Sequence, residues 1–295
     1  MANRSRQLKV SAINLAFVDA ASRNKPRAYC DLLRAIFESR TFVPLRGDRH
    51  MAIGSLYEDE NDESILRGVL YGVTSIDELA WFNLNEHRPA SEAERNRISV
   101  PEDMAANYRE YDYEFRSKLH RLVFLTREGS LRVSAVQTRY VFERLCKQPP
   151  IVDRFGDVSV SIEQEPEKLA AILDAGDLRA LSILVRRPNS GLGGFDADFE
   201  KRLEKLGASQ VQAEYKAATG DRLRPDDPIR RAAKVALSDG VVTATIRKDG
   251  ITQDVSTESF PVVETVTYNP DKESRLLALR RAVEKIMARI KKVAK

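Results

Sequence analysis

The residues whose types best suit chemistry on a phosphate lie in two short segments of the chain. These residues are Lys118, His120, Arg121, Arg186, Arg187 and Asn189. If residues 117–125 form a strand, Lys118 and His120 share one face and Arg121 points to the other. Histidine titrates near neutral pH and can move protons, while Lys and Arg stabilise the charge of a pentavalent phosphate. The segments predict phosphate contact or, as an alternative, metal-independent cleavage of RNA by His120 with Lys118. A hydrogen-bonded histidine beside surface arginines is the structural alternative.

No motif for a metal or a cofactor accompanies these residues in the sequence. His50, His87 and His120 lie at no zinc-ligand spacing from one another or from a cysteine. The sequence has neither a Walker A loop nor a G-x-S-x-G elbow, and the glycines of 191–194 match only part of a dinucleotide fingerprint. The carboxylate-x-lysine triplet at 214–216 falls in a segment expected to be helical. We therefore predict no cofactor and no metal.

Positive charge is concentrated at both ends of the chain. Residues 1–49 hold ten Lys and Arg against four Asp and Glu, residues 271–295 hold nine against three, and the whole chain carries +4. A basic surface attracts phosphates and releases counterions from nucleic acid, whereas evenly spread charge only keeps a surface soluble. The turn-forming segment 46–49 also presents two arginines to a ligand. The predicted nucleic-acid contacts are Arg46, Arg49, Lys118, Arg121, Arg186 and Arg187.

The last 25 residues, 271–295, predict an amphipathic basic helix. Its apolar residues recur at steps of three and four, which is the spacing of a helix–helix seam. The seam consists of Leu276, Leu279, Val283, Ile286, Ile290 and Val293. This helix has three alternative uses: packing on the protein's own sheet, self-association through the seam, or phosphate contact through its basic face.

The apolar and cysteine content indicates a soluble cytoplasmic protein. The chain is 42% hydrophobic, but no apolar run reaches the roughly 18 to 20 residues that span a bilayer. Its two cysteines, Cys30 and Cys146, lie in apolar, helix-like segments. We expect both to be buried free thiols, and we expect no membrane contact.

The order of predicted elements indicates an α+β fold with helices packed on a mainly antiparallel sheet. Strands are expected at 8–18, 41–46, 50–57, 65–73, 117–125, 157–162, 178–185, 233–247 and 251–268, and helices at 26–38, 133–147, 167–173 and 196–218. The N-terminal order matches half of a ferredoxin-like motif, which leaves open two ferredoxin-like halves. The expected regions are 1–115, 116–270 and the C-terminal helix 271–295.

Four segments taken together resemble an uncharacterised bacterial family. They are 45–49 with 54–57, 120–122, 185–189 and 263–268. The family is known as a domain of unknown function and is loosely associated with mobile elements and phage-defence neighbourhoods. The resemblance implies a defence or nucleic-acid context over roughly residues 8–270, and it brings no catalytic residues to this chain.

The leading hypothesis is a non-catalytic nucleic-acid-binding component, for DNA or RNA, of a bacterial antiviral defence system. The enzyme alternative is the metal-independent ribonuclease that uses His120. The third alternative is an oligomeric scaffold, sensor or inhibitor that contacts a second copy or a defence-system protein through the 276–293 seam.

Overall fold

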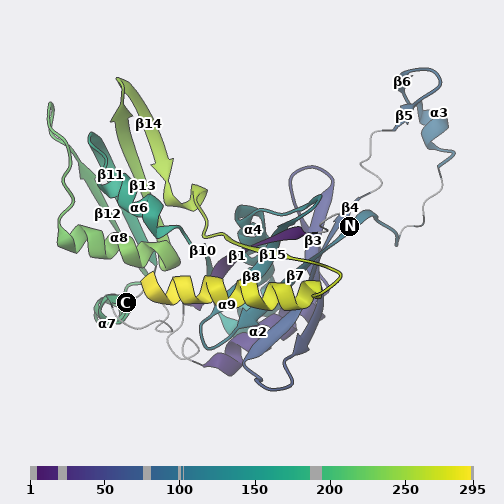
Figure 1. The fold of residues 1–295 in the computed structure, drawn as a ribbon, viewed down its shortest axis with the longest axis horizontal. Helices are drawn as coiled ribbons and strands as arrows, with labels where there is room; N and C mark the ends of the chain where they lie inside the picture. Colours follow the sequence, from purple (N-terminus) through teal and green to yellow (C-terminus); the bar gives the residue numbers. More distant parts are fainter. Residues whose placement is uncertain are drawn as a thin grey trace.

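The computed structural model describes residues 5–18, 25–75, 81–98, 101, 103–186 and 195–293 (Figure 1). These residues form a nine-stranded sheet, a separate four-stranded sheet and a small two-stranded one. The nine-stranded sheet contains β1 (Arg6–Phe17), β2 (Val43–Pro44), β3 (Arg49–Glu58), β4 (Ile65–Thr74), β7 (Ala106–Arg116), β8 (Arg121–Glu128), β9 (Leu131–Arg132), β10 (Val158–Ile162) and β15 (Glu264–Tyr268). The four-stranded sheet contains β11 (Leu178–Arg186), β12 (Gln210–Lys216), β13 (Gly240–Lys248) and β14 (Ile251–Ser256).

Helices cover both sheets. They are α2 (Pro26–Glu38), α4 (Ala135–Cys146), α5 (Pro149–Phe155), α6 (Pro166–Leu173), α7 (Phe195–Leu206), α8 (Asp227–Asp239) and α9 (Arg275–Val293). A 3-10 turn, η1 (Thr257–Ser259), follows β14. The sheets pair their strands antiparallel, so the predicted α+β fold with mainly antiparallel sheets is confirmed. The split β-α-β order occurs in both sheets, because β8 and β10 are parallel on either side of β1 and α4 and α5 connect them, and β12 and β13 are parallel on either side of β11 and α8 connects them. The N-terminal segment expected to form it does not, since β1 and β2, which flank α2, are separated by four strands.

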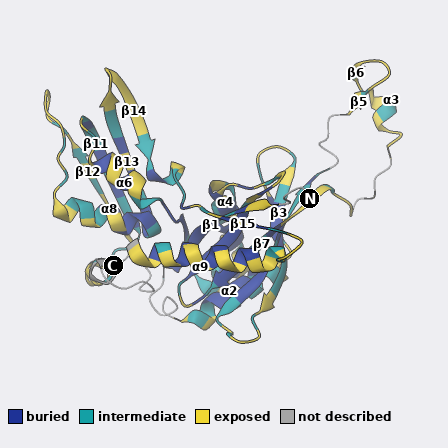
Figure 2. Ribbon diagram, viewed as in Figure 1, coloured by how far each residue is buried: buried dark blue, intermediate teal, exposed yellow. Residues whose placement is uncertain are grey.

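The large sheet has its core along β1, which is buried without interruption from Val10 to Phe17. Because successive side chains of a strand point to opposite faces, this burial requires cover on both faces. Helices α9 and α4 both pack against β1 and provide that cover. Figure 2 shows the middle of this sheet buried and the outward side of α9 exposed.

The apolar seam of the C-terminal helix is part of the protein's own core. Leu279, Val283, Ile286 and Ile290 are at most 3% exposed and belong to the cluster of the large sheet, while Leu276 at the start of α9 is 37% exposed. In Figure 1, α9 crosses the front of the large sheet toward the smaller one. Of the three alternatives, the structure supports packing on the protein's own sheet. The seam residues from Leu279 to Ile290 therefore belong to the core, and contact of the helix with a second copy stays a prediction.

The chain divides into cores differently from the predicted regions. One hydrophobic cluster joins residues from Leu8 to Ile162 with residues from Val262 to Ile290, and the other lies between Leu169 and Ala244. The predicted division at 115 and 116 falls inside β7, at its last residue, and β7 and β8 are hydrogen-bonded neighbours in one sheet. The smaller core is therefore an insertion between β10 and β15 of the larger sheet.

Two segments of the smaller sheet differ from the prediction. The helix expected at 196–218 ends at Leu206, because Gly207 takes a positive φ of 64° that stops it, and Gln210–Lys216 forms β12. The strand expected at 233–247 begins only at Gly240. The residues before it belong to α8, whose N-cap is Asp226; the side chain of Asp226 accepts a hydrogen bond from the Ile229 N–H at 3.0 Å.

The cysteines match the prediction of buried free thiols. Burial raises the pKa of the Cys146 thiol to about 12, and burial also raises the pKa of Cys30. Within the described part of the chain, no helix has the length and apolar character needed to cross a membrane.

The burial of α9 predicts how much single residues of this helix contribute to stability. Ile286→Ala removes a fully buried side chain and should lower the free energy of unfolding by about 2–5 kcal/mol, because it leaves a cavity. Leu277→Ala, on the same helix but 50% exposed, should change it by no more than about 0.5 kcal/mol. Urea denaturation of both variants provides the measurement. Equal losses would contradict the packing of the seam on the large sheet.

Candidate nucleic-acid interface

The two predicted catalytic residues do not lie together, because His120 is buried and Lys118 is exposed. His120 lies in the turn between β7 and β8, at a positive φ of 59°, and is 3% exposed. Its ring stacks on Tyr29 with 4.2 Å between centroids, and its carbonyl accepts from the Leu15 N–H at 3.0 Å. Lys118 points outward and pairs with Asp62 at 3.3 Å. A phosphodiester on the surface does not reach His120, so the geometry does not support this pair as a ribonuclease site.

Arg121, a predicted phosphate contact, is fully buried. Its Nε pairs with Glu163, and its Nη1 donates to Asn14 Oδ1 at 2.6 Å and to the Leu119 carbonyl at 2.8 Å. The same Glu163 carboxylate accepts from Ser238 Oγ at 2.8 Å. The expectation that Arg121 contacts a ligand on the surface is wrong, because its guanidinium is enclosed and neutralised.

The two remaining predicted segments do not join this turn. Arg186 ends β11 in the smaller sheet. Arg187, Asn189 and the glycines of 191–194 lie outside the described residues. The structure therefore does not bring the predicted basic residues into one groove.

Arg46 and Arg49 do belong to a cluster, with partners that the sequence did not single out. The cluster lies at the end of the large sheet where β1, β3 and β7 begin and where β4 and β8 end. We call it the basic edge, and it consists of Lys9, Arg46, Arg49, Arg109, Arg127 and Arg132. All five arginines are exposed and Lys9 is half-buried.

The sheet register brings these residues together. Lys9 of β1 lies directly opposite Arg127 of β8, and Arg127 lies directly opposite Arg132 of β9. Directly opposed residues of an antiparallel pair have their Cβ atoms roughly 4.5–5.5 Å apart on one face. Three cations therefore stand in one row across three strands.

The other half of the basic edge surrounds a narrow groove. Arg49 of β3, Arg109 of β7 and Arg132 of β9 line it together with His50. Gly72 of β4 leaves room between them, since an added Cβ would lie 3.3 Å from the Tyr111 ring. The cavity measures only about 30 Å³, so these arginines can contact a surface-bound anion but cannot enclose a small molecule.

The cations of the basic edge have no carboxylate partner among the described residues. Elsewhere in the described residues about half of the arginines have one, among them Arg34, Arg67, Arg88, Arg116, Arg121, Arg139, Arg179, Arg230, Arg275, Arg281 and Arg289. Other arginines, such as Arg27, Arg154 and Arg247, have none there, so the basic edge differs from them in the clustering of its cations.

The acids near the basic edge are engaged by other groups. Asp112 pairs with Arg275 at 2.5 Å, Glu128 accepts from the Tyr268 hydroxyl, and Glu110 accepts from the Tyr108 hydroxyl. Asp48 is the acid within the turn that carries Arg46 and Arg49. A hydroxyl does not neutralise a carboxylate, so Glu110 and Asp48 keep their negative charge near the six cations of the basic edge, which still outnumber them.

An arm leaves the sheet at the same end, between Thr74 of β4 and Ala106 of β7 (Figure 1). It contains β5 (Phe82–Asn83), β6 (Arg88–Pro89) and α3 (Glu92–Arg95). Glu94 organises it by accepting hydrogen bonds from Ser91, Arg88 and Asn83, and these bonds lower the pKa of Glu94 to about 2. Trp81 and Phe82 are 38% and 53% exposed on this arm.

The sequence held a signal for part of the basic edge. Arg127 and Arg132 flank a tight hairpin whose Gly129 adopts a positive φ of 56°, and such a turn places its flanking residues opposite each other. Lys9 and Arg109 carried no such signal, because their place depends on which strands become neighbours.

The carboxylate-x-lysine triplet lies on a strand rather than on the expected helix. Glu214 and Lys216 are exposed on β12, in a shallow depression that also contains Thr245 and Asp254. Among the residues with a described position, no group of three or more His, Cys, Asp or Glu side chains could hold a metal ion.

A family model with the description "Domain of unknown function (DUF4747)" matches residues 6–284. The chain belongs to this family. The match includes both sheets, the basic edge and the first half of α9, so the uncharacterised family expected from four short segments is confirmed over nearly the whole chain. A search of curated proteins finds no match.

The enclosed guanidinium of Arg121 predicts a large cost for its removal. Arg121→Met leaves Glu163 charged and buried without its partner and should lower the free energy of unfolding by about 3–5 kcal/mol. Lys118→Met, three residues away, removes only an exposed pair and should cost less than about 1 kcal/mol. Denaturant titration of both variants tests this. A stable Arg121→Met protein would show that the buried pair is dispensable.

Proposed function

We propose that the protein binds nucleic acid without cleaving it, through phosphate contacts along the basic edge. The observation that carries the proposal is the row Lys9–Arg127–Arg132, in which like charges face each other across neighbouring strands without a carboxylate. Such opposition destabilises a sheet, so folding alone does not account for it. A phosphate backbone supplies the missing negative charge.

The arrangement favours contacts that are weakly specific for sequence. Phosphate contacts fix the position of a protein on nucleic acid but carry no sequence information directly. The basic edge is an open surface over several strands, which fits an extended polyanion better than an enclosed small molecule. Aromatic side chains on the arm that rises from the same end are suited to stack on unpaired bases. The choice between DNA and RNA and the role in antiviral defence stay predictions from the sequence.

Trp81 is the single tryptophan of the chain and lies on the arm, so its fluorescence can report the binding of a ligand there. We expect unlabelled single-stranded DNA or RNA to change its fluorescence in a saturable titration. The logarithm of the binding constant should fall linearly with the logarithm of salt concentration, by about 0.7 per neutralised phosphate for single strands and about 0.9 for duplex. The double variant Arg127→Ala/Arg132→Ala should bind more weakly and lower that slope by about 1.4–1.8.

Arg247→Ala is the matched control, because Arg247 is an exposed arginine of β13 in the other sheet. It should leave both the affinity and the salt slope unchanged. Measuring anisotropy of a labelled oligonucleotide in parallel separates binding from arm movement. The proposal fails if neither DNA nor RNA binds at low salt, or if the double variant binds as well as the original chain.

A further inference from the structure

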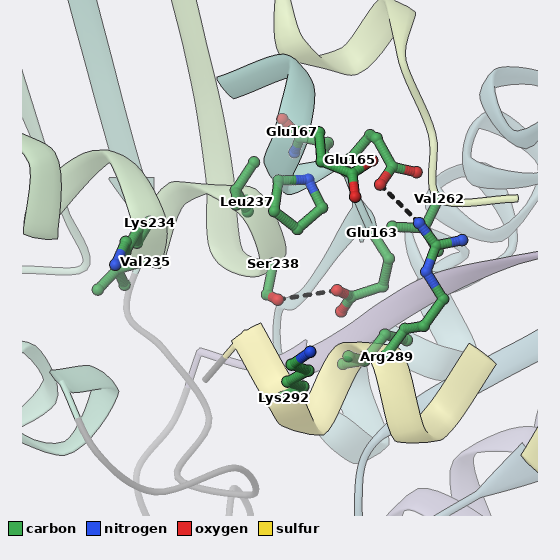
Figure 3. A pocket seen from close by; sticks show the side chains of 13 residues that line it. Glu163, Glu165, Glu167, Lys234, Val235, Leu237, Ser238, Val262, Arg289 and Lys292 are labelled. Carbon is green, nitrogen blue, oxygen red and sulfur yellow. Dashed lines mark hydrogen bonds and ion pairs between the residues drawn. The ribbon is translucent and has the colours of Figure 1, made fainter. Parts of the chain in front are cut away.

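A cavity of about 340 Å³ lies where the two hydrophobic cores meet, away from the basic edge (Figure 3). Its wall comes from the segment 163–167 between β10 and α6, from α8, from Val262 and from the C-terminal part of α9. The volume falls at the lower end of the range typical of ligand pockets, and such pockets are frequent at junctions between domains.

One part of the wall is apolar and buried. Val235, Leu237, Val262 and Ile290 line the cavity and are each at most 4% exposed. Pro166 lies in the same wall. Buried aliphatic side chains of this kind suit the flat face of a ring.

A fixed hydrogen-bond acceptor stands beside this apolar wall. Glu163 is held by Arg121 on one oxygen and by Ser238 Oγ at 2.8 Å on the other, and Figure 3 draws this contact among the lining side chains. An ionised carboxylate can accept about four hydrogen bonds, and Arg121 and Ser238 supply only two of them. Glu163 is therefore positioned to accept from an N–H or O–H group of a ligand without rearranging.

The charges of the lining favour an anionic group on the ligand. The carboxylates of Glu163 and Glu165 already have arginine partners, Arg121 and Arg289, the second at 2.6 Å. Lys234 and Lys292 line the same cavity, are exposed, and have no carboxylate partner among the described residues. Glu167 is the remaining acid of the lining, so two unpaired cations stand against one unpaired carboxylate.

We infer that this cavity binds a small molecule with a ring that carries N–H or O–H donors and with one anionic group, which is the chemistry of a nucleoside monophosphate. The ring packs on the apolar wall, its donors face Glu163, and the phosphate lies by Lys292, while Lys234 on another side of the cavity adds positive charge at longer range. This inference does not depend on nucleic-acid binding at the basic edge, because the two sites share no residue.

Isothermal titration calorimetry of the full chain with AMP, GMP, CMP and UMP tests the inference, with adenosine and inorganic phosphate as partial ligands. At least one monophosphate should bind more tightly than either partial ligand. Lys234→Ala/Lys292→Ala should weaken that monophosphate by about tenfold or more, since charge-assisted hydrogen bonds are lost, and should leave the affinity for adenosine unchanged.

Two control variants make each outcome decisive. Lys291→Ala changes an exposed neighbour of Lys292 that does not line the cavity, and it should bind like the original chain. Arg127→Ala/Arg132→Ala should also retain the monophosphate, which separates this site from the basic edge. Absence of binding by all four monophosphates, equal binding of adenosine or of inorganic phosphate, or unchanged binding in Lys234→Ala/Lys292→Ala would overturn the inference.

Discussion

The ion pair between Arg121 and Glu163 is the interaction on which the arrangement of the two sheets depends. A buried guanidinium is costly unless its charge and its donors are matched, and here Glu163, Asn14 and the Leu119 carbonyl match them. The network continues into the end of α8, which packs on the smaller sheet: Asn14 Nδ2 donates to Asp239 Oδ1 at 2.7 Å, and Ser238 donates to Glu163. Polar contacts with fixed partners thus define how the insertion between β10 and β15 sits on the large sheet.

This network and the basic edge occupy opposite ends of the same strand pair. In the register of β1 and β8, Asn14 lies opposite Arg121, and Lys9 lies opposite Arg127. Five residues of antiparallel strand separate the two ends by about 17 Å. Positive charge near the junction is enclosed and neutralised, whereas positive charge at the far end is left to solvent. One pair of strands therefore positions both the cavity at the junction and the exposed cations.

The sequence predicted the fold class and several strands well because their patterns are local. Residues 178–185 alternate between buried and half-buried positions, as a strand with one covered face does. The error at 117–125 arose because Lys118 and His120 continue the alternation of β8, while the positive φ of His120 turns the chain before that strand begins. No local pattern marks such a backbone conformation in a histidine.

The candidate site was only partly predictable for a different reason. Arg46 and Arg49 were chosen from a turn, which is a local feature and remains part of the basic edge. Lys9 and Arg109 join them only because β8 lies beside β1 and because β7 lies beside β4. Strand order of this kind depends on the packing of the whole sheet, which the sequence of one chain does not specify locally.

Net charge by region was a weaker guide to function than the pairing of each charge. The C-terminal helix is strongly basic, yet Arg275 pairs with Asp112, Arg281 with Glu273 and Arg289 with Glu165, so carboxylates elsewhere in the chain neutralise much of it. These pairs fasten α9 over the sheet that its apolar face covers. The first 49 residues contribute Lys9, Arg46 and Arg49, for which the described residues offer no such partner. A lysine or arginine that has no carboxylate partner within the protein can bind an external phosphate. One that already forms an ion pair within the protein is not available for that contact.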